Sequence, residues 1–310
     1  MKTNNLKLDE LIIAVYCRLD DELKSLVRGL PKSRIRQNGP TPILSDSEVL
    51  CLEVVGQFLG HNQDKETFDY FCRHHLDLFP RLEELHRTTY TRQSAKLWRF
   101  KEALWQRLVH ALPHHEGLSF LDSLPLPMCR FARASHTKLF KTQDVQGLQG
   151  AYGFDHVARQ TFWGFRLHVR VAFPGVITAF SLTGADQSDV AVAPQLLDDA
   201  QGLVIADRNY HSPYLQNELA RTSRARLLTP FKNKTQKENP QEKRLLSLLR
   251  YRIETVFSQW CDRLQLKTQK ARDTWHLQSR LLRAVLTHTL AIALAYERQI
   301  SPLQFRKLLD

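Results

Sequence analysis

The chain has 310 residues, of which 43% are apolar and 25% are charged. This composition excludes disordered, collagen-like and low-complexity proteins, and the length suits about two globular domains. The 44 Lys and Arg residues exceed the 32 Asp and Glu residues by 12, and such an excess favours a polyanionic partner, above all nucleic acid.

The positive charge is concentrated in one segment. Residues 221–283 contain 16 basic and 5 acidic residues, a net charge of +11, so the remainder of the chain is nearly neutral. A dense basic segment favours contact with a phosphate backbone, and a solvated surface of helix-forming Lys and Arg is the alternative explanation.

No export or membrane signal is recognisable in the sequence. The five cysteines lie far apart and form no C-x-x-C pair, which is typical of free thiols in a reducing compartment. The N-terminal residues lack the apolar core of a signal peptide, and residues 281–296 are too few and too polar to span a bilayer. We therefore expect a cytoplasmic protein without a membrane partner.

Residues 1–112 are expected to be helical throughout and to form an N-terminal DNA-binding domain. Ser45 and Glu48 have the spacing of a capping box at the start of an apolar helix. Residues 91–112 have the pattern of a second long helix, which follows a Thr-rich turn at residues 86–91. A basic helix entered through a turn is consistent with a helix-turn-helix, and equally with a plain surface helix.

A boundary is expected near Pro113, after which the pattern changes to short apolar strands and helices. The expected strands are residues 118–125, 162–172, 176–182, 202–207 and 225–230. The expected helices are residues 189–200, 213–221, 241–264 and 274–296. This order predicts an α/β or α+β domain with a mixed sheet, covering residues 113–310.

Asp122 and Asp207 each end an apolar strand. Most such residues begin a turn or cap a helix, and we assign that role to Asp186 and Asp189. Ligands of α/β sheets, however, gather at one set of strand ends. If the two strands are neighbours, the carboxylates of Asp122 and Asp207 converge, and one of them stays protonated unless a cation lies between them. Oxygen donors without His or Cys suit Mg²⁺ or Mn²⁺.

Glu254 is the candidate for a third carboxylate. It lies in the expected basic helix beside Ile253 and Val256, which are expected to face the core, so it can be drawn towards the sheet. A surface ion pair with Arg250 or Arg252 is the alternative. Three such acids would hold two divalent ions for an in-line phosphoryl displacement.

Residues 130–161 combine basic and aromatic side chains, including Lys138, Tyr152 and Phe154. Such a mixture can clamp a DNA end or a flipped base. An ordinary long loop explains it equally well.

Five motifs resemble the DDE transposases of bacterial insertion sequences. They are Asp-Ser-Leu-Pro-Leu-Pro-Met-Cys at residues 122–129, Thr-Lys-Leu-Phe at 137–140, Trp-Gly-Phe-Arg-Leu-His at 163–168, Ile-Ala-Asp-Arg-Asn-Tyr at 205–210 and Arg-Ile-Glu-Thr-Val-Phe-Ser-Gln at 252–259. The first motif is most similar to the insertion-sequence 982 group. Arg208-Asn209 departs from the Lys-Gly of many relatives, which leaves the turn after Asp207 less certain.

The resemblance implies an RNase H-like mixed sheet flanked by helices, preceded by the all-α N-terminal domain. Asp122, Asp207 and Glu254 would be both catalytic and metal-binding, with two Mg²⁺ ions that Mn²⁺ can replace. Such enzymes bind terminal inverted repeats of double-stranded DNA, cut the ends of the element and join the 3′-hydroxyl to target DNA. A homodimer in the active complex and a place near the bacterial nucleoid are implied as well.

Nine basic side chains are the expected DNA contacts: Arg92, Lys96, Lys138, Arg166, Arg208, Lys232, Lys234, Arg250 and Arg252. Two other functions remain open from the sequence. One is an RNase H-like DNA nuclease without strand transfer, and the other is a non-catalytic DNA-binding protein derived from a transposase. End-specific binding by residues 1–112 favours a transposase over the nuclease, and the intact trio of acids disfavours the non-catalytic protein.

Overall fold

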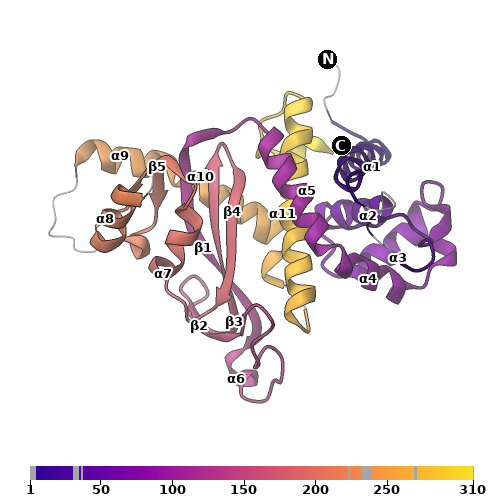
Figure 1. Cartoon of the computed structure of the whole chain (residues 1–310), viewed down its shortest axis with the longest axis horizontal. Helices are drawn as coiled ribbons and strands as arrows, with labels where there is room; N and C mark the ends of the chain where they lie inside the picture. Colours follow the sequence, from indigo (N-terminus) through magenta and orange to yellow (C-terminus); the bar gives the residue numbers. More distant parts are fainter. Residues whose placement is uncertain are drawn as a thin grey trace. The chain divides into compact units, whose positions relative to one another are not determined.

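Helices form the N-terminal part of the chain and a mixed sheet follows them (Figure 1). The computed structural model describes residues 5–30, 35, 38–222, 224–231, 239–268 and 271–309. Two compact units divide the chain: Pro113–Gln259 form one, and Met1–Leu112 form the other with Trp260–Asp310. In the described residues, no helix combines the length and the apolar character that crossing a membrane requires.

The first unit is built from helices. They are α1 (Leu8–Val27), α2 (Asp46–Phe58), α3 (Asp64–His74), α4 (Arg87–Lys96), α5 (Trp98–Ala111) and α11 (Thr274–Glu297). The expected helical character of residues 1–112 is confirmed where the structure describes them. The capping box is confirmed as well, because Ser45 Oγ accepts from Glu48 N at 3.1 Å and Glu48 Oε2 accepts from Ser45 N at 2.6 Å.

The expected Thr-rich turn at residues 86–91 is wrong. Helix α4 begins at Arg87, because His86 precedes it in extended conformation and its ring accepts from the Thr88 N–H. The expected helix over residues 91–112 is divided at Leu97, which separates α4 from α5. The segment is therefore helix and does not form the turn of a helix-turn-helix. DNA binding by residues 1–112 stays a prediction.

Residues 260–310 pack with the helical unit, whereas we expected them to continue the domain that begins at residue 113. The boundary at Leu112 agrees with the expectation. Helix α11 is buried on nearly every side from Leu277 to Ala295, so it needs neighbours all round, and α5 and α2 supply them. Which residues form the catalytic domain remains a prediction.

Buried charges in the first unit are paired across helices. Lys101 Nζ lies 2.7 Å from Glu53 Oε1, and Arg283 Nη1 lies 2.8 Å from Asp64 Oδ1. Burial lowers the pKa of Lys101, and the neighbouring Glu53 opposes that change. Removing one partner of such a pair leaves an uncompensated buried charge, so these contacts tie α11 and α5 to α2 and α3.

The second unit contains a six-stranded mixed sheet. Its strands are β1 (His115–Arg130), β2 (Ala151–Asp155), β3 (Gln160–Phe173), β4 (Val176–Gly184), β5 (Gln201–Ala206) and β6 (Arg224–Leu228). Strands β1, β3 and β4 are antiparallel neighbours, while β5 pairs with β1 and β6 pairs with β5 in parallel. Strand β2 extends the sheet along the first residues of β3. This topology confirms the expected mixed sheet flanked by helices.

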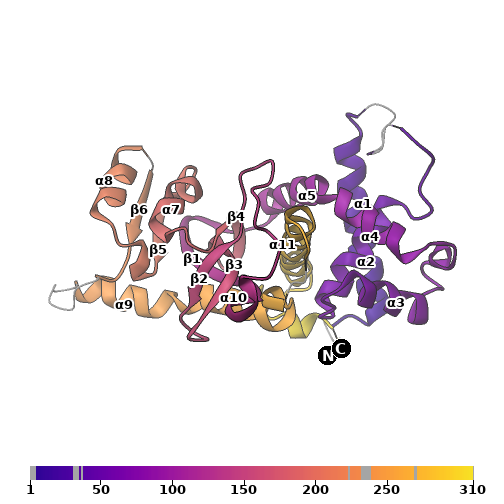
Figure 2. The same ribbon diagram turned by 90° about the horizontal axis from the view of Figure 1, so that it is seen from below.

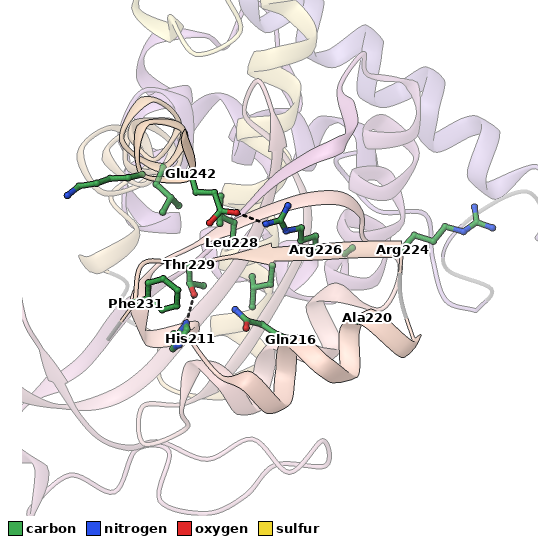
Figure 3. A pocket seen from close by; sticks show the side chains of 13 residues that line it. His211, Gln216, Ala220, Arg224, Arg226, Leu228, Thr229, Phe231 and Glu242 are labelled. Carbon is green, nitrogen blue, oxygen red and sulfur yellow. Dashed lines mark hydrogen bonds and ion pairs between the residues drawn. The ribbon is translucent and has the colours of Figure 1, made fainter. Parts of the chain in front are cut away.

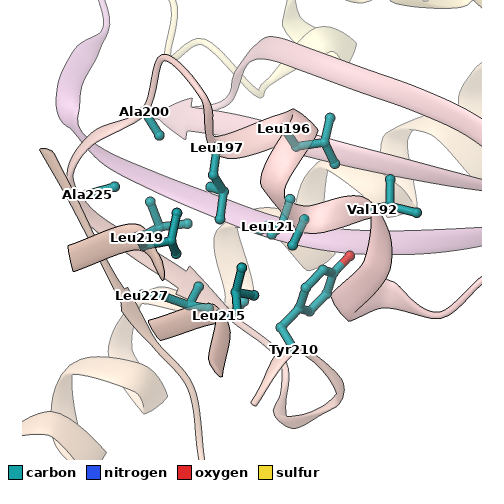
Figure 4. Packing of buried hydrophobic residues seen from close by; sticks show 13 residues of the cluster. Leu121, Val192, Leu196, Leu197, Ala200, Tyr210, Leu215, Leu219, Ala225 and Leu227 are labelled. Carbon is teal, nitrogen blue, oxygen red and sulfur yellow. The ribbon is translucent and has the colours of Figure 1, made fainter. Parts of the chain in front are cut away.

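Helices cover both faces of this sheet. Helices α7 (Asp189–Leu197) and α8 (Pro213–Thr222) enclose an apolar cluster with β1, β5 and β6 (Figure 4). Helices α9 (Pro240–Leu249) and α10 (Tyr251–Ser258) replace the single long helix expected at residues 241–264 and meet at Arg250. In Figure 2, α7 and α10 lie on opposite sides of β1 and β5.

Gly202 lies on β5 directly before its first pair with β1, and we expect its replacement to destabilise the sheet. Its φ is +67°, and a Cβ there would collide with the backbone of Gly117. Gly147 has a φ of +78° but open space around it. Gly202→Ala should lose roughly 2–3 kcal/mol of unfolding free energy, and Gly147→Ala about 1 kcal/mol. Denaturant unfolding checks this, and equal losses in both variants would contradict the close approach.

Candidate active site

The register of β1 and β5 sets two carboxylates side by side. The two strands pair in parallel up to Leu121, which lies opposite Ala206. Asp122 is the next residue of β1 and Asp207 directly follows β5, so each acid comes one residue after the last pair of this register. The negative charge of Asp207 acts on Asp122, and the meeting of the two carboxylates around a cation stays a prediction. Asp122 does not end β1, which continues to Arg130.

The alternation of side chains places this pair on one face of the sheet. Leu121 and Ala206 both belong to the apolar cluster under α7 and α8 (Figure 4). Since successive side chains of a strand point to opposite faces, Asp122 and Asp207 point away from that cluster. Helix α10 packs against β1, and Arg250, at its start, approaches Asp207.

The surroundings of Asp122 favour its protonated form. Burial raises the pKa of its carboxyl from an ordinary value of 3.8 to about 7, and the negative charges of Asp207 and Asp189 add to the rise. The backbone N–H of Ser123, which donates to Asp122 Oδ1 at 2.8 Å, acts in the opposite direction. Two acids held this close cannot both ionise freely without a cation.

Arg250 brings a positive charge to the pair. Its Nη2 lies 3.4 Å from Asp207 Oδ1, and both side chains are partly exposed. Glu254 lies four residues further along, one helical turn away and on the same side of α10. Ile253 and Val256 are buried beneath the helix, while Glu254 is exposed.

The structure nevertheless does not gather the three acids into a metal-binding cluster. Across the described residues, no group of three or more His, Cys, Asp or Glu side chains is close enough to hold a metal ion. Asp122 and Asp207 are brought together, and Glu254 is presented from the adjoining helix. The role of Glu254 as a third ligand therefore stays a prediction.

A buried polar cluster behind Asp122 was missed by the sequence reasoning. The Asp189 carboxylate lies 3.4 Å from His168 Nδ1 and 3.9 Å from Arg166 Nη1, and Arg166 donates to Ser123 Oγ at 3.1 Å. Burial raises the pKa of Asp189, but His168, Ser123 and Arg166 together lower it below its ordinary value. The helix cap is Ser188, not Asp189.

The sequence contained a signal for this cluster. Arg166 and His168 are two residues apart in β3, so both point to the same face of the sheet, and the contact of His168 with Asp189 shows that this face carries α7. Their polarity in a buried strand requires partners, and Asp189 is one. Arg166 was expected to contact DNA, but its side chain is 17% exposed and engaged with Ser123. Arg166 is therefore better placed to hold β1, the strand that carries Asp122, than to contact DNA at the surface.

The other expected DNA contacts are mostly on the surface. Four are exposed, namely Arg92, Lys96, Lys138 and Arg208. Arg252 is partly buried, and its guanidinium lies over the rings of Tyr251 and Phe173 at 4.9 and 5.1 Å from their centroids. Lys232 and Lys234 lie outside the described residues.

A cavity of about 560 Å³ opens beside β6, between α8 and α9 (Figure 3). Arg224, Arg226 and Lys243 line it, and Arg226 is paired with Glu242 at 2.5 Å. It is also lined by His211, four residues after Asp207, whose ring contacts the Thr229 hydroxyl at 2.9 Å. These cations lie in the basic segment, but no motif in the sequence singles them out.

Comparison with known proteins assigns a family to this part of the chain. Residues 113–274, just over half of the chain, match the family described as a transposase DDE domain. No curated protein matches the chain. Among solved structures, the chain is similar to the cryo-EM structure of the piggyBac transposase synaptic complex with hairpin DNA. The TM-score is 0.42 and the identity 9%, with 98% of this chain and 79% of that chain covered.

Without divalent ions, we expect Asp122 to make the protein less stable as the pH rises. Its pKa is raised in the folded state, so its favourable contribution is complete below about pH 4 and is lost as the pH approaches 7. Asp122→Asn should therefore raise the melting temperature more at pH 8 than at pH 5, measured by thermal unfolding in EDTA.

Asp199→Asn is the control for this measurement. The contact with Arg170 lowers the pKa of Asp199, although burial opposes it, so this variant should show no gain at pH 8. A difference between Asp122→Asn and the parent protein that does not change with pH would contradict the raised pKa.

Proposed function

The chain belongs to the transposase DDE domain family, and we propose that it is a DNA transposase that cuts the ends of an insertion sequence and joins the freed 3′-hydroxyl to target DNA. The observation that supports this most is the in-register placement of Asp122 beside Asp207 on one face of the sheet. Strand transfer of this kind needs carboxylates at a single point, beside a surface that holds phosphates.

The residues at the site fit divalent ions such as Mg²⁺ or Mn²⁺. The donors are carboxylate oxygens, and the raised pKa of Asp122 reflects a negative charge that burial and Asp207 disfavour. We propose Asp122, Asp207 and Glu254 as the ligands of two ions. When bound, such ions activate a water or a 3′-hydroxyl and stabilise the leaving oxygen in an in-line displacement.

The protein's own groups would position the reacting ends. The cluster of Ser123, Arg166, His168 and Asp189 holds β1 and α7 together directly behind Asp122. Arg250, which contacts Asp207, is placed to meet a phosphate at the same point. Removal of Arg250 would leave Asp207 without this positive neighbour.

The remaining cations would hold the DNA backbone. Arg208 is exposed directly after Asp207, and Arg224 and Lys243 line the cavity beside β6. Contacts of this kind release counterions from DNA, so binding should weaken as salt rises. We assign the terminal inverted repeats to residues 1–112, where Arg92 and Lys96 are exposed. We further propose a homodimer in the complex that joins two ends, and the insertion-sequence 982 group as the nearest group.

The direct test is cleavage of a duplex that carries the terminus of the flanking element. Purified protein and Mn²⁺ should cut a labelled duplex at the element boundary and join the new 3′-hydroxyl to a plasmid. Cutting without joining would show a nuclease. Binding without cutting under the same conditions would show a DNA-binding protein that lacks catalysis.

The three acids should each be essential for the chemistry. Asp122→Asn, Asp207→Asn and Glu254→Gln remove a negative charge and a ligand oxygen, while leaving the size of the side chain nearly unchanged. We expect cleavage to fall by at least about 1,000-fold in each variant, in line with the loss of a transition-state interaction worth ~4 kcal/mol. Binding to the element's ends, measured by fluorescence anisotropy in EDTA, should stay within about threefold.

Two acids serve as matched controls. Glu242→Gln alters a carboxylate on α9 that pairs with Arg226, and Asp199→Asn alters a surface carboxylate. Both should cut at close to the parental rate. If all three candidate variants kept activity within a few-fold of the parent, the assignment of the site would be refuted. If only Glu254→Gln did so, the third ligand would lie elsewhere.

A further inference from the structure

Strand β2 reverses the usual distribution of side chains on an edge strand. Its sequence is Ala-Tyr-Gly-Phe-Asp, and the large residues Tyr152 and Phe154 point outward with 46% and 43% of their surface exposed. The inward positions hold no large apolar residue, and a Cβ on Gly153 would collide with Ala185. An edge strand normally buries its aromatics and exposes its small or polar residues. This arrangement therefore presents ring faces to solvent.

A third aromatic side chain extends the exposed surface. Phe131, the first residue of the short helix α6 (Phe131–Ala134), is 61% exposed, and its ring centroid lies 5.8 Å from that of Tyr152. Tyr152 in turn rests edge-on against Trp163 of β3, at 5.0 Å. Trp163 is nearly buried, and its indole N–H donates to the Leu139 carbonyl at 3.3 Å. The rings thus stand on a fixed support, and we call Phe131, Tyr152 and Phe154 the aromatic platform.

The segment that carries the aromatic platform is basic. Residues 130–161 contain five basic and two acidic residues, a net charge of +3. The two acids are occupied locally, since Asp144 accepts from the backbone N–H groups of Gln146 and Leu148 and Asp155 is buried. The guanidinium groups of Arg130 and Arg133 are exposed and pair with no carboxylate in the described part of the chain.

This combination selects one class of partner. Exposed rings beside unpaired cations suit a polyanion that carries flat apolar faces, and nucleic acid has both properties. The base faces of a duplex are hidden by stacking, so only unpaired bases can lie on a ring. An apolar protein surface or a membrane would contact the aromatic rings but would not require the neighbouring cations.

We propose that the aromatic platform stacks the unpaired bases of a DNA strand, with Arg130 and Arg133 on the adjoining phosphates. This inference rests on the proposed function, which supplies locally unpaired DNA at a cut end. Arg130 is eight residues beyond Asp122 on β1, or about 26 Å at ~3.3 Å per residue. A DNA strand that leaves the carboxylates along β1 therefore reaches the aromatic platform.

The test measures binding of a single strand to the full chain in EDTA. Three labelled probes are used: a 12-nucleotide oligothymidylate, an abasic strand of equal length, and a 12-base-pair duplex. The parent protein should bind the oligothymidylate more tightly than the abasic strand. Tyr152→Ala and Phe154→Ala should each weaken oligothymidylate binding roughly 5- to 100-fold, and should change abasic and duplex binding by less than about twofold.

Two further variants control for folding and for exposure. Tyr152→Phe keeps the ring and should bind like the parent, and Tyr214→Ala removes an aromatic of α8 that is 76% exposed and should also change nothing. Among the described residues, Phe154 makes a ring contact only with His156. Phe154→Ala therefore tests stacking even if Tyr152→Ala unfolds the protein. Melting temperatures identify a variant that is not folded.

The proposal is overturned if the parent protein binds both single strands equally, or if the Ala variants weaken all three probes alike. A platform whose Ala variants bind oligothymidylate like the parent would be a docking surface for another protein. The proposed transposase function fails separately, in the cleavage of the duplex terminus with Mn²⁺. Binding in EDTA does not depend on cleavage, so the two failures are distinguishable.

Discussion

The register between β1 and β5 is the constraint on which the candidate site depends. A shift of one residue would turn Asp122 into the apolar cluster and leave Leu121 beside Asp207. Packing resists such a shift, because Leu121 and Ala206 are both buried under α7 and α8. Close approach of Gly202 to Gly117 fixes the other end of the pairing. The positions of the two acids are therefore determined by apolar contacts on the opposite face of the sheet.

This separation of roles explains how the fold tolerates an unfavourable pair of charges. The face that packs against α7 and α8 stabilises the sheet by burying leucine and alanine side chains. The opposite face carries Asp122, whose raised pKa records the cost of holding its charge there. Arg250 reduces that cost from a partly exposed position beside Asp207. In the described part of the site, no buried Lys or Arg side chain pairs with Asp122. The carboxylates can therefore accept a cation.

The fold and the acids differ in how far the sequence predicts them. Strand patterns predicted β3, β4, β5 and β6, and the acids that follow apolar runs led to the proposal that Asp122 and Asp207 meet. Contacts between distant segments were beyond such patterns. Asp189 meets His168 only because α7 folds back over β3, and residues 260–310 join the first unit because α11 needs apolar neighbours on all sides. The turn expected before α4 failed for a local reason, since the His86 ring takes the role of a helix cap.

The strand residues for which we propose functions are those that break the alternation of inward apolar and outward polar side chains in this sheet. Asp122 interrupts an apolar strand, Arg166 and His168 place polar groups in a buried one, and Tyr152 with Phe154 turns aromatic rings to solvent. None of these departures improves packing. Burial of the Asp122 carboxylate reduces the stability of the fold, and exposure of the Tyr152 and Phe154 rings reduces solubility. A sheet held in register by its apolar cluster can support such positions, because its stability does not depend on them. The acids and the rings lie at different places along β1 and its neighbours, so a single DNA strand can reach both.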